Sequence, residues 1–170
     1  LGVPATRRMR MTHGGLNLDT ALVAEDHTFA LDYGDTDIRS ALRDYVELEL
    51  TFRLRKLSGM LVDDQHLFEP ALLEENFDIN LSLLPDKYLP AIETIRLIRS
   101  LAYQKTGHTL DQYFHDLLAF TLLNLNTYPF QQAFVDAASL QSYMHSLILA
   151  GHLCAELDDE AQVSAALPAN

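Results

Sequence analysis

The sequence predicts a mainly α fold: a helical bundle with a C-terminal antiparallel helical hairpin and room for a small β element in the N-terminal third. Three apolar-periodic stretches follow one another between Pro85 and Leu157, separated by helix start and stop signals. Gly107 ends the first stretch, and Thr109 and Gln112 have the spacing of a capping box that opens the second. With 48% hydrophobic residues, the chain can also bury a substantial core.

Length and charge limit the class of protein. A chain of 170 residues is about one domain, and we expect a helical domain at 21–157 between a flexible basic arm at 1–20 and an acidic tail at 158–170. The formal net charge of −12 repels phosphate backbones and disfavours nucleic acid as a partner. No apolar run has the length of a membrane span. The lone Cys154 and the lack of an apolar signal segment favour a cytoplasmic location.

The N-terminal third carries a strand signal and a cluster of positive charge. Two short apolar runs at 21–23 and 28–31 flank a polar trio and predict a β-hairpin. The arm before them contains Arg7, Arg8 and Arg10. These arginines either lie on the acidic body of the protein or bind an acidic partner.

Residues 37–58 give conflicting signals. Apolar and polar residues alternate over 46–54, which is the period of a half-buried strand. A cap at Asp35 or Thr36, basic residues near the end of the segment and a stop at Gly59 favour a helix instead. We favour the helix, and its apolar residues on all sides predict a central position in the bundle.

The middle of the chain is expected to be a connector over 60–67 followed by a short helix over 70–75. The alternation at 77–83 leaves helix, strand and extended linker open. Pro90 favours the start of a helix that runs to about residue 105. The side chains of that helix expected to face mostly inward are Ile92, Ile95, Leu97, Ile98 and Leu101.

Two histidines on the last helix are the candidates for a ligand or metal site. If 110–126 and 130–157 form the hairpin, His145 and His152 share the apolar face of the second helix. His108 and His115 then lie at a similar axial level, and four imidazoles could hold a transition metal. However, His115 is turned away from the core face, and no Glu-x-x-His element supports the site. Ordinary hydrogen-bonded histidines are therefore the preferred interpretation, and no cofactor is predicted.

Other short motifs are weaker. The run His13-Gly14-Gly15 is similar to the oxyanion-hole loops of some hydrolases, but the chain has no Gly-x-Ser-x-Gly element, and we interpret the run as a flexible loop. The acidic residues at 32–37 lack the spacing of a calcium loop and fit a capping turn.

The absence of a catalytic signature favours a non-enzymatic regulatory or adaptor domain that binds a protein partner, with a homodimer as one form. Four apolar residues of the last helix lie away from its main apolar face and need either a larger core or a second chain. These candidate interface residues are Tyr143, Leu147, Leu153 and Leu157. An acidic inhibitor of a basic protein and a ligand- or metal-binding bundle that uses His145 and His152 are the alternatives.

Overall fold

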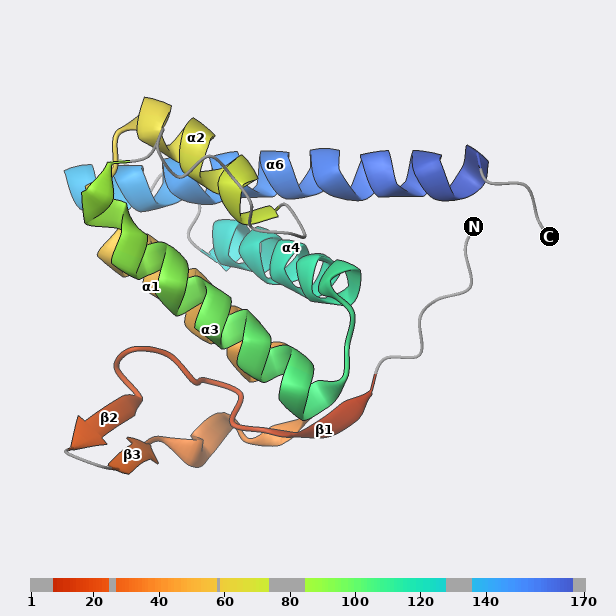
Figure 1. The fold of residues 1–170 in the computed structure, drawn as a ribbon. Helices are drawn as coiled ribbons and strands as arrows, with labels where there is room; N and C mark the ends of the chain where they lie inside the picture. The colour runs from red at the N-terminus through yellow and green to blue at the C-terminus, as the bar shows by residue number, and fades with distance from the viewer. Residues whose placement is uncertain (1–7, 25–26, 58, 74–84, 128–135, 167–170) are drawn as a thin grey trace.

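The computed structural model describes residues 8–24, 27–57, 59–73, 85–127 and 136–166. The helices are α1 (Arg43–Lys56), α2 (Val62–Leu73), α3 (Leu89–Thr106), α4 (Leu110–Thr127) and α6 (Ala137–Ala166). The strands are β1 (Met9–Thr12), β2 (Ala21–Ala24), β3 (His27–Ala30) and β4 (Asp37–Ser40), and two short 3-10 helices are η1 (Tyr33–Asp35) and η3 (Asp86–Tyr88). The mainly α class is confirmed, and the strands lie at one end of the helical bundle (Figure 1).

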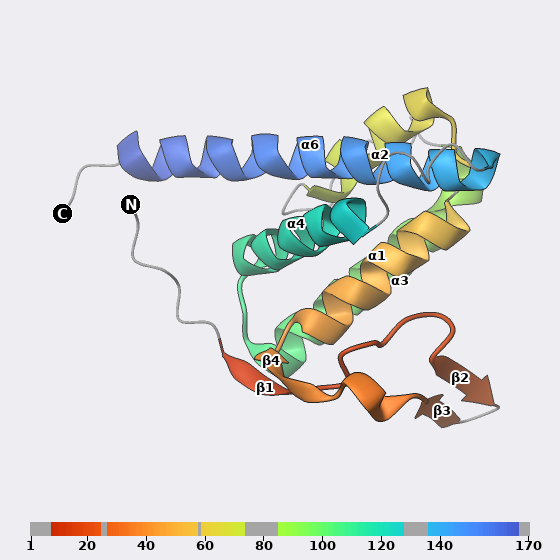
Figure 2. The same ribbon diagram turned by 180° about the vertical axis from the view of Figure 1, so that it is seen from behind.

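Helix α1 lies at the centre of the bundle, as its all-round apolar sequence predicts. It contacts α3, α4 and α6, and α3 runs alongside it in both views (Figures 1 and 2). The segment 46–54 is helical, because the buried Val46, Leu50 and Arg53 recur every three or four residues. The residues that alternate with them are mostly half-buried, because neighbouring helices cover α1 on several sides.

The predicted start of this helix near Asp37 is wrong. Residues 37–40 form β4, which pairs antiparallel with β1 in a register that places Met9 opposite Ser40. The strand partner lies far away in the sequence, so a local pattern could not show it. Residues 8–20 accordingly belong to the folded body, which differs from the flexible arm expected there.

The predicted β-hairpin is confirmed. Strands β2 and β3 pair antiparallel, with Ala21 opposite Ala30 and Ala24 opposite His27. They form a two-stranded sheet separate from the β1–β4 ribbon.

Helix α2 replaces the predicted connector at 60–67 and the short helix at 70–75. It begins at Val62 and includes Asp63 and Asp64 in its first turn. Negative charge there interacts favourably with the helix dipole and stabilises the helix. Pro70 lies inside the helix near its end, although its missing N–H removes one backbone bond. Burial of Phe68 and its neighbours on this helix outweighs that loss. The segment 77–83 lies outside the described residues.

The boundaries of α3 and α4 follow the predicted signals. Pro90 lies in the first turn of α3, and Gly107 ends the helix in the left-handed conformation with φ of 66°. Both reciprocal hydrogen bonds of the capping box of α4 are present. The Thr109 N–H donates to Gln112 Oε1 at 3.0 Å, and the Gln112 N–H donates to Thr109 Oγ1 at 3.3 Å.

The inward face of α3 is narrower than predicted. Ile92, Ile95 and Ile98 are buried, but Leu97 and Leu101 are 59% and 39% exposed. On a helix these two leucines lie to the side of the buried isoleucine stripe, so the structure corrects their predicted inward position.

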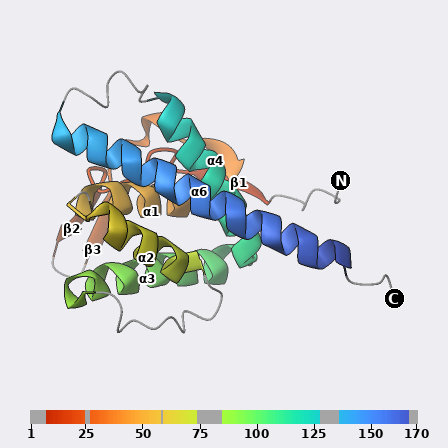
Figure 3. The ribbon, with the colours of Figure 1, turned by 90° about the horizontal axis from the view of Figure 1, so that it is seen from above.

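Helices α4 and α6 form the predicted antiparallel hairpin (Figure 3). The described part of α6 begins at Ala137, and the predicted turn and start at 128–135 lie outside the described residues. Its other end differs from the expected boundary at 157, because the helix continues to Ala166. These last turns extend beyond the other helices in all three ribbon views.

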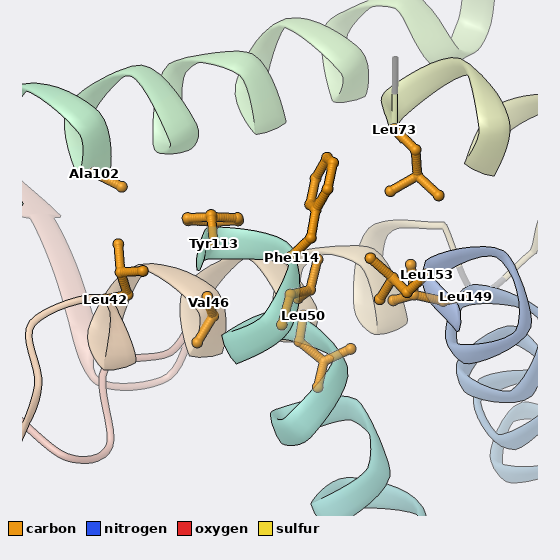
Figure 4. Packing of buried hydrophobic residues seen from close by; sticks show 10 residues of the cluster. Leu42, Val46, Leu50, Leu73, Ala102, Tyr113, Phe114, Leu149 and Leu153 are labelled. Carbon is orange, nitrogen blue, oxygen red and sulfur yellow. The ribbon is translucent and has the colours of Figure 1, made fainter. Parts of the chain in front are cut away.

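The core is made of two apolar clusters. The larger one lies mainly between α1, α4 and α6 (Figure 4). Its buried members are Leu42, Val46, Leu50, Leu73, Ala102, Tyr113, Phe114, Leu117, Leu149 and Leu153. The second lies between α2 and the start of α3, around Phe68, Leu72 and Ile95. None of the helices in the described ranges has both the length and the apolar character of a membrane span.

Candidate functional site

A fully buried network of charged side chains lies at the junction of the helices. Glu49 of α1 is at its centre. Glu49 Oε1 accepts from Arg53 Nη2 at 2.7 Å and from Arg99 Nη2 at 2.8 Å, while Oε2 accepts from Arg99 Nε at 3.0 Å. The hydroxyl of Tyr113 on α4 also donates to Oε2, at 2.8 Å. The carboxylate thus joins α1, α3 and α4.

The network extends to the two remaining helices through Glu69. Arg53 Nη1 donates to Glu69 Oε2, and Glu69 Oε1 lies 2.7 Å from His145 Nε2. Glu49, Arg53, Glu69 and His145 are each 0% exposed. Five helices therefore meet in one set of buried hydrogen bonds.

The charges in this network stabilise one another. Burial would raise the pKa of Glu69, but the charge of Arg53 and the hydrogen bonds from His145 and Arg53 outweigh it and lower the pKa to about 2. For Glu49, too, the nearby arginines Arg99 and Arg53 overcome burial and lower its pKa. Burial and the Glu49 charge raise the pKa of Tyr113, which keeps its hydroxyl protonated as a donor. Two carboxylates thus face two guanidinium groups.

The contact with Glu69 determines which ring nitrogen of His145 is the hydrogen-bond donor. Because Glu69 is ionised, its oxygen can only accept, so Nε2 of His145 carries the donated proton. The other ring nitrogen, Nδ1, has no hydrogen-bond partner among the described residues. The imidazole is buried and hydrogen-bonded to Glu69, so it is a structural group that exposes no face to a ligand.

The Glu69 carboxylate predicts how stability depends on pH. Its pKa is lower in the folded protein than its usual 4.5, so its contribution is present above about pH 4.5 and is lost as the pH falls towards 2. We expect the free energy of unfolding of the wild type to exceed that of Glu69→Gln near neutral pH. This gap should narrow steadily below pH 4.5 in denaturant titrations followed by circular dichroism. The exposed Glu93→Gln should track the wild type, and a constant gap for Glu69→Gln would contradict the assigned ionisation.

The structure separates the two histidines that the sequence placed in one site. His152 lies on the same face of α6 as His145, but its Nε2 is 3.3 Å from Nδ1 of His66 on α2. His115 is exposed, as its angular position suggested, and its Nε2 lies 3.3 Å from Oδ1 of Asp111. Among the described residues, no group of three or more histidine, cysteine or carboxylate side chains converges on a point where it could hold a metal.

A cavity of about 230 Å³ lies between α3 and the start of α4, lined by Tyr103, Tyr113 and His108 among others. His108 is 5% exposed, and neither of its ring nitrogens has a hydrogen-bond partner within the described ranges. Burial lowers the pKa of His108 and favours the neutral ring. Arg96 and Arg99 also line this cavity, so its walls combine aromatic and charged side chains.

Two of the four candidate interface residues of the last helix belong to the core or pack against it. Leu153 is completely buried in the larger cluster, and Leu157 packs against it. Tyr143 is half-buried, and Leu147 is 43% exposed. The larger core, which was the alternative to a second chain, accounts for Leu153 and Leu157.

The arginines of the N-terminal segment bind the protein's own helix α3. Arg8 Nη1 donates to the carbonyl of Thr106 at 2.8 Å, and Arg10 Nη1 donates to that of Lys105 at 3.0 Å. These carbonyls belong to the last turn of α3, where they lack helical partners and where positive charge is stabilising. Arg7 lies outside the described residues.

The loop after β1 binds a carboxylate of its own chain. The N–H groups of His13 and Gly14 donate to the two oxygens of Asp44, at 2.9 and 3.0 Å. Two adjacent backbone donors are thus occupied by the carboxylate of Asp44 on α1. The loop is held in place by this contact, in contrast to the flexible loop that we predicted.

The β1–β4 ribbon carries an apolar surface that was not predicted from the sequence. Met9, Met11 and Ile38 are 56%, 72% and 60% exposed. Met11 and Ile38 are directly opposite in the register, and Met9 is two residues from Met11, so all three share one face. The alternation of Met9, Arg10, Met11 and Thr12 was the signal that could have revealed it.

No protein-family model, curated protein or solved structure matches the chain.

Proposed function

We propose that this chain is a helical adaptor or regulatory domain that works by binding a protein partner with a basic surface. The observation that carries the proposal is the exposed apolar face of the β1–β4 ribbon, formed by Met9, Met11 and Ile38, which we call the ribbon face. Exposed apolar side chains that gather on one face are typical of interaction sites, whereas isolated ones are common on any surface.

The surroundings of the ribbon face resemble the rim of an interface. Asp32 and Asp35, in the segment that leads into β4, and Asp37, its first residue, are exposed. The side chain of Asp32 caps η1 by accepting from the Gly34 N–H, so part of this acidic group also has a local structural role. An apolar centre with a polar, charged rim is the usual organisation of a protein interface.

The overall charge supports a basic partner. With a formal net charge of −12, the chain attracts positively charged surfaces and repels a second copy of itself. The same chemistry would serve an acidic inhibitor of a basic protein, which is a special case of this proposal. The buried network supports a binding role over an enzymatic one, because its titratable groups are enclosed and its carboxylates are paired with guanidinium groups.

Polar substitution of the ribbon face tests the proposal. We expect Met11→Ser/Ile38→Ser to weaken partner binding about tenfold or more, because each lost apolar anchor removes on the order of 1 kcal/mol or more. The measurement is quantitative capture from the source lysate, followed by titration of the identified partner at low and high salt. Leu97→Ser, on the exposed side of α3, is the matched control and should bind like the wild type.

The outcomes separate the forms of the proposal. Weaker partner binding at high salt supports a basic partner. A loss of binding in the ribbon variant but not in Leu97→Ser supports the ribbon face as the interface. Equal binding by the ribbon variant and the wild type would overturn the ribbon face as the interface. Size-exclusion chromatography with light scattering reports the homodimer, and a dimer that the ribbon variant dissociates would replace the basic partner with a second copy of the chain.

A further inference from the structure

A pair of imidazoles joins α2 to α6 at the surface of the bundle. Nδ1 of His66 lies 3.3 Å from Nε2 of His152, and the two rings are inclined at 71° with their centres 5.5 Å apart. His66 is exposed and His152 is half-buried, so both rings can be reached from solvent. The buried network does not include this pair.

The pair differs from the other histidine that packs between these helices. His145 lies two turns earlier on the same face of α6, but it is enclosed and bound to Glu69. The ring of His152 instead lies next to a second imidazole, that of His66. Imidazole nitrogens are among the preferred ligands of zinc, copper and nickel.

The separation of the two nitrogens matches a shared metal ion. Zinc binds histidine nitrogen at about 2.0–2.1 Å with tetrahedral angles, which places two ligand nitrogens about 3.3–3.4 Å apart. The observed 3.3 Å therefore allows one ion to bind both nitrogens after rotation of the rings, with little movement of the helices. The proton between the rings moves to the other nitrogen of the same imidazole, so neutral rings bind the ion without net proton release.

We propose that His66 and His152 form a two-imidazole site for a first-row transition metal ion that links α2 to α6. Two protein ligands leave the remaining coordination positions of a four-coordinate ion to water. Because the ligands come from two helices, the ion binds the folded protein and not the unfolded chain, and it stabilises the contact between α2 and α6.

Zinc titration of the full chain tests the site. At pH 7.5 we expect saturable 1:1 binding of ZnCl₂ by calorimetry and a thermal midpoint that rises with zinc concentration. His66→Ala and His152→Ala should each weaken zinc binding about tenfold or more and abolish the rise of the midpoint. MgCl₂ should have neither effect, because magnesium prefers oxygen ligands.

Two controls distinguish this site from general metal binding. His115→Ala removes an exposed histidine next to Asp111 and should leave zinc binding unchanged. Cys154→Ser removes an exposed thiol two positions from His152 and should also leave it unchanged. Undiminished binding by His66→Ala/His152→Ala, loss of binding in Cys154→Ser, or no saturable binding by the wild type would each overturn the proposal. Circular dichroism of every variant verifies that the helices remain folded.

Discussion

Substitution of Glu49 by glutamine is expected to lower the free energy of unfolding by about 3–5 kcal/mol, because breaking a buried ion pair leaves an uncompensated buried charge. In the variant, Arg53 would keep Glu69 as an acidic partner, whereas Arg99 would lose the carboxylate that it contacts. The amide of glutamine would also direct a donor towards side chains that can only donate. Denaturant unfolding followed by circular dichroism measures the change.

Glu47→Gln is the matched control on the same helix. Glu47 is half-buried, and its Oε2 lies 3.4 Å from Nε of Arg43. Burial raises the pKa of Glu47, so its charge contributes little to stability. We expect this substitution to change the free energy of unfolding by about 1 kcal/mol or less. Equal losses for the two glutamine variants would contradict the view that the central network, and not acidic charge on α1 in general, stabilises the bundle.

Substitution of Gly14 by alanine is expected to destabilise the protein by about 2–3 kcal/mol. Gly14 has φ of 81°, a conformation that other residues rarely adopt, and a Cβ built on it would lie 2.1 Å from the carbonyl oxygen of Asp35. The obstacle is backbone, so a side-chain rotation cannot relieve it. The loop would have to move away from η1, which would strain the bonds of the His13 and Gly14 N–H groups to Asp44.

The neighbouring glycine provides the comparison. A Cβ at Gly15 meets nothing within 4 Å, and its φ lies outside the left-handed region. Gly15→Ala is therefore expected to be neutral or slightly stabilising, by about 0.4–1 kcal/mol, because it restricts the unfolded chain. Thermal unfolding of the two alanine variants checks the contrast, and similar midpoints would mean that the loop does not hold Gly14 against Asp35.

The helices could be predicted where their signals are local. Gly107 and the pair Thr109–Gln112 act through bonds within a few residues, and both boundaries are confirmed. The position of β4 could not be predicted in this way, because its partner β1 lies in a distant segment. The start of α2 was missed because Asp63 and Asp64 were interpreted as loop residues, although acidic residues also favour the first turn of a helix.

The candidate site was harder to predict than the fold. The sequence placed His145 on an inward face, which is confirmed, but it could not show that Glu69 from another helix would bind it. Glu49 and Arg53 lie four residues apart on one helix, and the contact that this spacing favours is present. The arrival of Arg99 at the same carboxylate depends on tertiary packing. Leu153 shows the same limit, because a residue away from the main face of α6 still lies in the core.

The anchoring of the N-terminal segment also bears on the order of folding. The bond from Arg8 to the Thr106 carbonyl joins residues 98 positions apart, and β1 lies between this bond and the contact of its loop with Asp44. Such distant contacts form after the chain between them has become compact, because closing a long loop of disordered chain is entropically unfavourable. Strand β1 can therefore pair with β4 early, whereas the bond from Arg8 forms only after the end of α3 is in place. Until then, the ribbon that carries Met11 and Ile38 can be paired, but it lacks the bond that joins it to α3.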